Sequence, residues 1–191
     1  MRVIAGEFKG RQLKAVPGKT TRPTTDKVKE AVFQVMGPFF QEGACLDLFA
    51  GSGSLGIEAL SRGIEQAIFV DKHPTAIHTI HENLQSVRME HNTEVFRADA
   101  FRAIHAAAKR QLKFDLILLD PPYKKVNYET FLHEIVQLQL IKSNGIIYCE
   151  HDLSEQLPPD GEHFKIMKQE NYGGTVGVTI YKRIEEGSND H

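Results

Sequence analysis

The sequence predicts an α/β fold built around a mostly parallel sheet. Three observations favour it: short apolar runs alternate with segments of helical periodicity, a glycine-rich turn directly follows the first run, and two strand-like segments close the chain. The 191 residues are 41% hydrophobic and 25% charged, which is typical of a packed domain and not of a disordered chain.

The N-terminal segment is expected to form a small extension. Residues 2–16 resemble two short strands around positions 9 and 10, and residues 17–25 are rich in turn-forming residues, so they predict a loop. A helix capped by Thr24 or Thr25 should follow. Its apolar residues recur at helical spacing: Val28, Ala31, Val32 and Val35.

The core repeats a strand-and-helix pattern from residue 44 onward, and this order is typical of βαβ units with parallel strands. The expected strands are 45–49, 67–71, 94–97, 115–119 and 145–149, and the expected helices are 54–62, 74–87, 100–110 and 128–140. Two further strands, 164–170 and 175–183, predict a closing hairpin. The chain therefore divides into a basic extension (1–40) packed on the core, a main domain (41–184) and a flexible tail (185–191).

Composition and patterning restrict the cellular setting. No run approaches the roughly 18 apolar residues that a membrane span needs, and the N-terminus has no signal-peptide core. We therefore expect a cytoplasmic protein that binds no membrane and, as a small single domain, is a monomer. Cys45 and Cys149 lie in apolar runs and are expected to be buried free thiols.

Charge is distributed unevenly along the chain. Residues 1–40 contain eight Lys and Arg residues and three acidic residues, although the whole chain carries a formal net charge of −2. A basic segment on an acidic body favours contact with a polyanion such as RNA, through Lys9, Arg11 and Lys14. The alternative is a solvated surface hairpin.

A glycine-rich turn lies between the first strand and its helix. Gly51, Gly53 and Gly56 fit the pattern G-x-G-x-x-G, in which the backbone turns tightly and a ligand approaches closely. Asp71 ends the next strand, where an acid can accept hydrogen bonds from both ribose hydroxyls of an adenosine. Alone, this pair also fits an NAD-dependent dehydrogenase. The alternative for Asp71 is a helix cap.

Asp47 helps to separate these cofactors. A carboxylate four residues before Gly51 would repel a pyrophosphate, whereas S-adenosylmethionine brings a cationic amino group and a sulfonium. Asp47 could instead bind only the backbone of the turn. Asp99 can accept from an adenine amino group beside the Ala100 backbone, or simply cap the next helix. The predicted cofactor set is Thr24, Asp47, Phe49, Gly51, Gly53, Asp71, Lys72, Asp99, Ala100 and Asp120.

The motif Asp120-Pro121-Pro122-Tyr123 directly follows an apolar strand. Ligands bind outside the carboxyl ends of strands in open α/β sheets, so this loop is expected in the site. The Asp120 carboxylate and the Pro121 carbonyl can each accept one N–H of an exocyclic base amine, orienting a poor nucleophile toward a methyl donor. Tyr123 offers a ring for stacking the base beside Pro122. The catalytic candidates are Asp120, Pro121 and Tyr123.

The motifs resemble class I amino-methyltransferases, and the N-terminal block narrows the resemblance. The stretches RVIAGEFKGR from Arg2 and TRPTTDKVKEA from Thr21 are similar to the RsmD family of bacterial 16S rRNA guanine-N2 methyltransferases. The resemblance covers roughly residues 1–184. It implies a Rossmann-like, seven-stranded sheet with an antiparallel last strand, S-adenosylmethionine as cofactor, and small-subunit rRNA or a 30S assembly particle as partner. It also implies that Arg22 and Thr24 lie over the cofactor or beside the RNA.

Other functions stay open from the residues alone. A DNA adenine-N6 or cytosine-N4 methyltransferase would use the same D-P-P-Y chemistry, but no additional DNA-reading region is evident. A non-catalytic S-adenosylmethionine-binding assembly protein and an NAD(P)-dependent oxidoreductase are weaker alternatives. We predict no metal site, because His73, His78 and His81 are expected on a solvated helix face. The target nucleotide, the choice between naked RNA and a particle, and the role of Tyr172 are not determined by the sequence.

Overall fold

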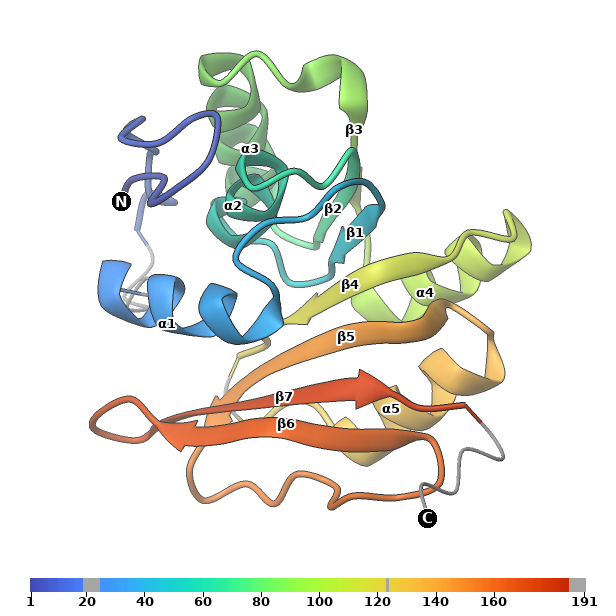
Figure 1. Ribbon diagram of the computed structural model, residues 1–191. Coiled ribbons are helices and arrows are strands. Elements are labelled where there is room, and N and C mark those ends of the chain that lie inside the picture. The colour runs from blue at the N-terminus through green and yellow to red at the C-terminus, as the bar shows by residue number, and fades with distance from the viewer. Residues whose placement is uncertain (19–24, 123, 186–191) are drawn as a thin grey trace. The chain divides into compact units, whose positions relative to one another are not determined.

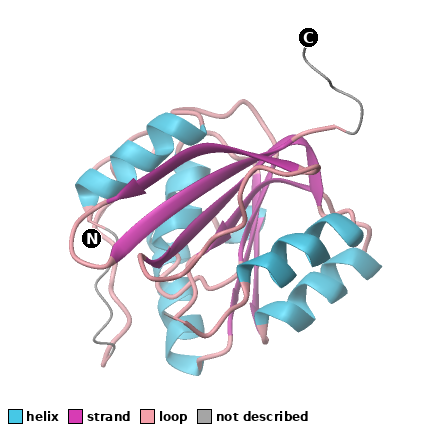
Figure 2. Cartoon of the chain, turned by 90° about the horizontal axis from the view of Figure 1, so that it is seen from below, coloured by secondary structure: helices cyan, strands magenta, loops and turns pink. Residues whose placement is uncertain are grey.

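The computed structural model describes residues 1–18, 25–122 and 124–185. The chain forms two compact units, Met1–Ala103 and Ile104–His191. Helices and strands make up the larger part of the described chain (Figure 2). No helix in the described residues is long and apolar enough to cross a membrane.

The first unit contains three parallel strands with helices between them (Figure 1). Strand β2 pairs with both β1 and β3, and helices α2 and α3 pack beside these strands. The strands are β1 (Ala44–Asp47), β2 (Gln66–Asp71) and β3 (Thr93–Arg97), and the helices are α1 (Asp26–Met36), α2 (Ser54–Ser61), α3 (Pro74–Ser86) and the 3-10 turn η1 (Glu90–Asn92). Pro74 opens α3 because the first helical position needs no N–H donor.

The N-terminal segment differs from the two strands that its sequence predicts. Only one isolated antiparallel bridge forms, between Arg2 and Gln12. The backbone N–H groups of Ile4 and Phe8 donate instead to side chains of α2, Glu58 at 2.9 Å and Ser61 at 2.9 Å. Because helix side chains satisfy these donors, no longer strand ladder is needed.

Helix α1 begins where expected. Its N-cap is Thr25, whose Oγ1 accepts from the Val28 N–H at 3.3 Å. The buried face differs from the predicted one, since among the predicted residues only Val32 is fully buried. The buried side chains are Lys29, Val32, Phe33 and Met36.

The second unit carries one parallel and two antiparallel strand pairs. Strand β5 lies parallel to β4 and antiparallel to β7, which also pairs with β6. The strands are β4 (Phe114–Leu119), β5 (Ile141–Asp152), β6 (Phe164–Asn171) and β7 (Val176–Arg183), with α5 (Tyr128–Gln137) after β4. Helix α4 (Ala100–Lys109) contains the boundary between the units.

These elements confirm the predicted fold class, an α/β protein with a mixed, mostly parallel seven-stranded sheet and an antiparallel last strand. Strand β5 begins before the predicted residue 145, at Ile141, and continues past residue 149 to Asp152. Cys45 and Cys149 are buried free thiols, as expected.

Candidate functional site

The glycine turn of the first unit depends on left-handed backbone. Gly51 has a φ of 56° and Gly53 a φ of 82°, a region that residues with a Cβ rarely adopt. The turn is closed by a hydrogen bond of 2.8 Å from the Gly53 N–H to the Ala50 carbonyl. A Cβ on Gly51 would meet nothing within 4 Å, so a ligand can approach the backbone here.

Gly56 serves a different purpose in the same motif. Its φ is not left-handed, but a Cβ at this position would lie 2.4 Å from Cε1 of Phe69 on β2. Helix α2 can therefore approach the sheet only with glycine at this position. This is the close helix-to-strand packing expected of the third glycine in G-x-G-x-x-G.

Asp47 lies buried beneath this turn, with 2% of its surface exposed. Its Oδ2 accepts from the Gly56 N–H at 3.2 Å. Burial raises the pKa of Asp47 from its ordinary 3.8 to about 7; the Gly56 N–H opposes the rise and the Asp71 charge adds to it. The contact with the turn backbone is the structural alternative that the sequence left open, and any role toward a cofactor stays a prediction.

Asp71 joins the glycine turn to the start of α3. Its Oδ2 accepts from the Gly51 N–H at 3.0 Å, and its Oδ1 accepts from the His73 N–H at 2.9 Å. The N-cap of α3 is His73, so Asp71 is not the helix cap that the sequence offered as the alternative. A carboxylate oxygen has two lone pairs, so each can also accept from a ribose hydroxyl.

Asp99 has the capping role that was its structural alternative. Its Oδ1 accepts from the N–H groups of Phe101 at 3.0 Å and Arg102 at 3.1 Å, at the start of α4. The other predicted cofactor residues differ in exposure: Ala100 is buried, Phe49 half-buried and Lys72 exposed. Thr24 lies outside the described residues.

Two buried polar side chains near the glycine turn were not predicted. Asn83 of α3 donates to the Ser52 carbonyl at 2.8 Å and also bonds both the N–H and the carbonyl of Lys14. The Lys29 Nζ donates to Ser54 Oγ at 2.8 Å. The available signal is weak: Asn83 lies three residues after Ile80 and Lys29 three residues before Val32, so each shares a helix face with an apolar residue.

The D-P-P motif of the second unit follows β4 directly. Pro121 is buried and Pro122 exposed, while Tyr123 and the predicted RNA contact Arg22 lie outside the described residues. The Lys125 N–H donates to the Pro122 carbonyl at 3.4 Å, closing a turn in which Lys124 has a φ of 59°.

Acidic groups gather near this motif. Burial, followed by the charges of Glu150 and Asp120, raises the pKa of Tyr148 well above its usual range. The Tyr148 Oη donates to Glu150 Oε1 at 3.4 Å. The tyrosine therefore stays protonated at neutral pH.

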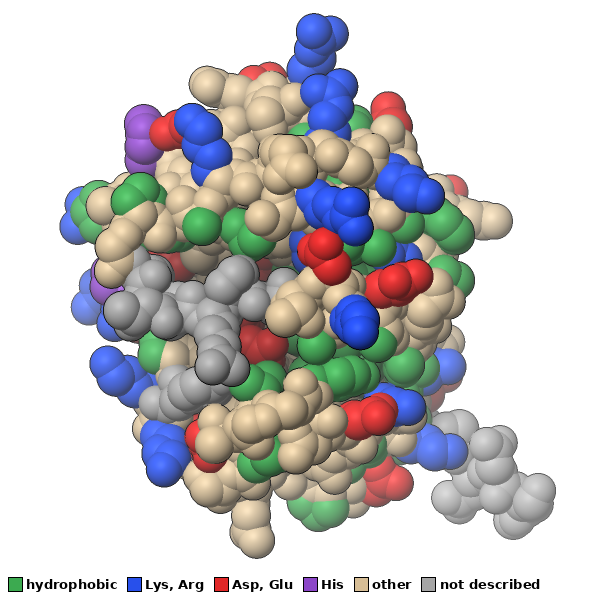
Figure 3. Space-filling view, turned by 90° about the vertical axis from the view of Figure 1, so that its left-hand side faces the viewer, with side chains coloured by type: hydrophobic (Ala, Val, Ile, Leu, Met, Phe, Trp, Pro, Cys, Tyr) green, Lys and Arg blue, Asp and Glu red, His purple; other side chains and the backbone are tan. Residues whose placement is uncertain are grey.

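The basic extension is less available for RNA than its composition suggests. Arg2 pairs with Asp26 at 2.9 Å, Lys14 pairs with Glu82, and Lys29 is buried. Lys9 and Arg11 are exposed. On the face shown in Figure 3, Lys and Arg side chains stand among Asp and Glu side chains and not in one continuous patch.

The alternating fold, the glycine turn with its acids and the D-P-P motif after β4 define a class of protein, the Rossmann-like S-adenosylmethionine-dependent methyltransferases. Within this class, the chain belongs to the family described as Conserved hypothetical protein 95, whose model matches residues 1–182 and which includes the RsmD methyltransferases. The predicted family, enzyme class and cofactor are confirmed.

Individual relatives agree with this assignment. The chain is 51% identical to YlbH of Bacillus subtilis, provisionally named an rRNA methyltransferase, over 96% of this chain and 99% of the relative. It is 32% identical to ribosomal RNA small subunit methyltransferase D of Haemophilus influenzae, over 95% and 92%. It also resembles a solved structure from Escherichia coli, provisionally described as the methyltransferase yhhF, with a TM-score of 0.81, 28% identity and coverage of 97% and 99%.

Proposed function

We propose that this protein transfers a methyl group from S-adenosylmethionine to the exocyclic N2 amino group of a guanine in 16S rRNA. The observation that carries the proposal is the Asp120-Pro121-Pro122 motif at the carboxyl end of β4 in a chain of the RsmD family. The relationship to ribosomal RNA small subunit methyltransferase D supports the choice of substrate. Such a substrate also supports action in the cytoplasm, where ribosomes assemble.

The reaction requires acceptors more than it requires a strong base. The Asp120 carboxylate and the Pro121 carbonyl each accept one N–H of the guanine amino group, so that its lone pair faces the sulfonium methyl. The methyl group moves from sulfur to nitrogen and leaves S-adenosylhomocysteine. The nitrogen then loses one proton, which Asp120 accepts.

The glycine turn accounts for cofactor binding in this proposal. Gly51 and Gly53 let the backbone approach the amino acid part of S-adenosylmethionine, Asp71 accepts from the ribose hydroxyls, and Asp99 with Ala100 contacts the adenine. Phe49, Lys72 and Thr24 complete the pocket. Asp47 acts from below by holding the Gly56 backbone.

RNA contact is assigned to exposed Lys and Arg side chains and to the aromatic ring of Tyr123. Lys9 and Arg11 are exposed and can pair with phosphates, and Arg22 belongs to the same predicted set. Lys14 contributes only if its pair with Glu82 opens. Tyr123 and Pro122 receive the unstacked base.

The test is methyl transfer from labelled S-adenosylmethionine to small-subunit particles from a strain lacking this protein, followed by nucleoside analysis. We expect N2-methylguanosine as the product. In Asp120→Ala we expect kcat to fall about 10³-fold, because that variant loses the hydrogen-bond acceptor for the guanine amine and the group that takes its proton. Exposed Glu129→Ala is the matched control and should keep full activity.

Three other outcomes would contradict the proposal. Label on adenine or cytosine of duplex DNA would identify a DNA amino-methyltransferase that uses the same motif. Cofactor binding by calorimetry with no label on RNA or DNA would favour a non-catalytic assembly protein. Full activity in Asp120→Ala would show that Asp120 does not have the role assigned to it in methyl transfer.

A further inference from the structure

The turn that carries the D-P-P motif is held by a side chain from a distant part of the second unit. Glu155, in the segment after β5, accepts from the Lys124 N–H through Oε1 at 3.1 Å. Through Oε2 it accepts from the Asp152 N–H at 2.9 Å. One carboxylate therefore joins the end of β5 to the residue two positions after Pro122.

The composition of the motif explains why such a contact matters. Proline has no N–H, so Pro121 and Pro122 cannot donate a hydrogen bond that would fix the turn. After them, Lys124 is the first described residue with a backbone donor, and Glu155 accepts that bond. The other described bond that closes the turn, from the Lys125 N–H to the Pro122 carbonyl, is long at 3.4 Å.

Lys124 also has an unfavourable backbone conformation. Its φ of 59° lies in the left-handed region, which costs a residue with a Cβ free energy unless surrounding contacts offset it. Its side chain is exposed, so packing of that side chain contributes little. The bond to Glu155 is the described contact that stabilises this conformation.

Glu155 is itself fixed in place. Its N–H donates to the Asp152 carbonyl at 3.0 Å, which closes a tight turn. Asp152 Oδ1 accepts from both the N–H and the hydroxyl of Ser154, at 2.9 and 2.6 Å. The Leu153 N–H donates to the Thr175 carbonyl at 2.8 Å, before β7. Because these hydrogen bonds fix the backbone around Glu155, its carboxylate can determine where the proline turn lies.

We propose that Glu155 is a positioning residue for methyl transfer: it fixes the turn after Asp120-Pro121-Pro122 and thereby the two acceptors for the substrate amine. It does not touch the reacting atoms. This role rests on the proposed function. It predicts that loss of Glu155 lowers kcat and changes the KM for S-adenosylmethionine much less, because Asp120 is the one member of the predicted cofactor set next to this turn.

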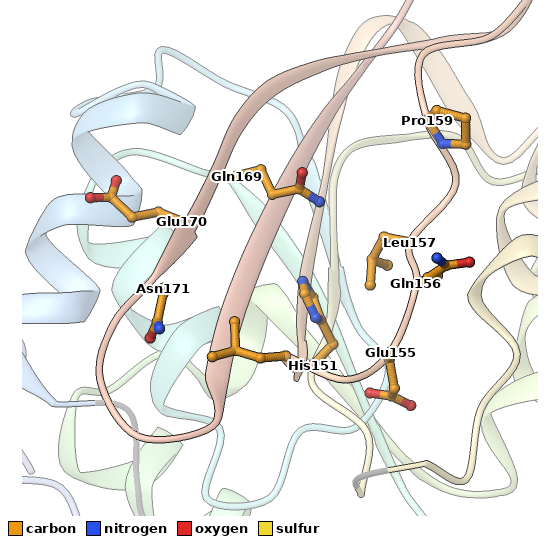
Figure 4. A pocket seen from close by; sticks show the side chains of 9 residues that line it. His151, Glu155, Gln156, Leu157, Pro159, Gln169, Glu170 and Asn171 are labelled. Atoms are coloured by element: carbon orange, nitrogen blue, oxygen red, sulfur yellow. The ribbon is translucent and has the colours of Figure 1, made fainter.

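The chain offers a matched control in the same pocket. Glu155 and Glu170 both line a cavity of about 590 Å³ in the second unit. Figure 4 shows them on opposite sides, with the Glu170 carboxylate pointing away from Glu155. Glu170 pairs with Lys168 on its own strand, so Glu170→Ala removes an equal charge from the same pocket without removing the bond to Lys124.

The experiment compares Glu155→Ala, Glu155→Gln and Glu170→Ala by steady-state kinetics and by hydrogen exchange of the peptide covering residues 120–127. We expect Glu155→Ala to lower kcat by about 10- to 100-fold, since small misplacements of positioning groups have effects of that size. Glu155→Gln keeps one acceptor oxygen and should recover part of the rate. Exchange in the peptide should follow the same order, with Glu170→Ala like the parent protein.

Hydrogen exchange separates this proposal from the proposed function, because it needs no substrate. If the peptide exchanges equally fast in Glu155→Ala and in the parent, the carboxylate does not hold the turn and the proposal is wrong, whatever the enzyme methylates. Faster exchange with unchanged kcat would also overturn it. An equal fall in kcat for Glu170→Ala would indicate a general effect of charge in the pocket.

Discussion

The glycine turn of the first unit and the proline turn of the second meet the same backbone requirement in opposite ways. Each contains a left-handed residue, Gly51 with a φ of 56° and Lys124 with a φ of 59°. At the first position glycine adopts this conformation without strain. At the second a lysine adopts it and Glu155, far along the chain, accepts its N–H. A motif can therefore carry its own backbone determinants or depend on a residue outside it.

The acids beside the two turns also differ. Asp47 is buried and contacts the backbone of α2 directly, so burial raises its pKa to about 7. Asp152 beside Glu155 is half-buried and accepts from Ser154, and these hydrogen bonds hold its pKa below the usual range. We therefore expect the first turn to respond to pH near neutrality, and Asp152 beside the second turn to stay ionised there.

The largest expected effect on stability concerns Asp47→Asn. Folding favours the protonated form of Asp47, so its contribution to the free energy of unfolding is fully present below pH 4 and is lost as pH rises through about 7. Asparagine stays neutral and its oxygen can still accept from the Gly56 N–H. The variant should therefore gain up to about 4 kcal/mol relative to the parent at pH 8, the equivalent of a shift of about three pKa units.

Denaturant unfolding at pH 4 and at pH 8 measures this difference. The two proteins should have nearly equal stability at pH 4. A variant that is less stable than the parent at pH 8 would mean that the ionised carboxylate stabilises the turn. Asp152→Asn, at a half-buried acid whose pKa is lowered and not raised, serves as the control and should show no gain in stability at pH 8.

The next effect concerns the close packing at Gly56. In Gly56→Ala the new Cβ would lie 2.4 Å from Phe69 Cε1, which forces α2 away from β2. Overpacking of this kind costs about 3 kcal/mol, measured as a lower denaturation midpoint. Gly161→Ala, where φ is not left-handed and the nearest atom to the new Cβ lies 3.9 Å away, is a control for the loss of a glycine without a clash. Equal losses in the two variants would rule out the packing explanation.

The sequence predicted much of this arrangement because its determinants are local. The strand-and-helix alternation, the Thr25 cap and the three glycines each act within a few residues, so pattern and spacing were sufficient. The prediction of two short N-terminal strands was wrong. The N–H groups of this segment donate to Glu58 and Ser61 of α2, which lie more than 50 residues away in the sequence.

The support of the site could not be predicted for the same physical reason. Asn83 binds Ser52 and Lys14 across 31 and 69 positions, and Glu155 binds Lys124 across 31. Polar residues on a helix face or in a loop are usually solvated, so nothing in their local pattern distinguishes these from surface side chains. Only the three-dimensional contacts identify them.

The smallest expected effect comes from variants that exchange the residue types of the two turns, and these variants test the comparison most directly. Gly51→Ala introduces a Cβ at a φ of 56° with no clash, so it should lose about 1 kcal/mol through backbone strain alone. Lys124→Gly should relieve the backbone strain at a φ of 59°. This gain should offset the greater entropy that glycine has in the unfolded chain, so stability should stay within about 1 kcal/mol of the parent.

The double variant Lys124→Gly with Glu155→Ala tests the same comparison by hydrogen exchange. Exchange of residues 120–127 should be faster than in either single variant, because both the bond to Glu155 and the restricted backbone are lost. If Lys124→Gly instead restored slow exchange to Glu155→Ala, strain at Lys124 and not the missing acceptor would be what loosens the proline turn.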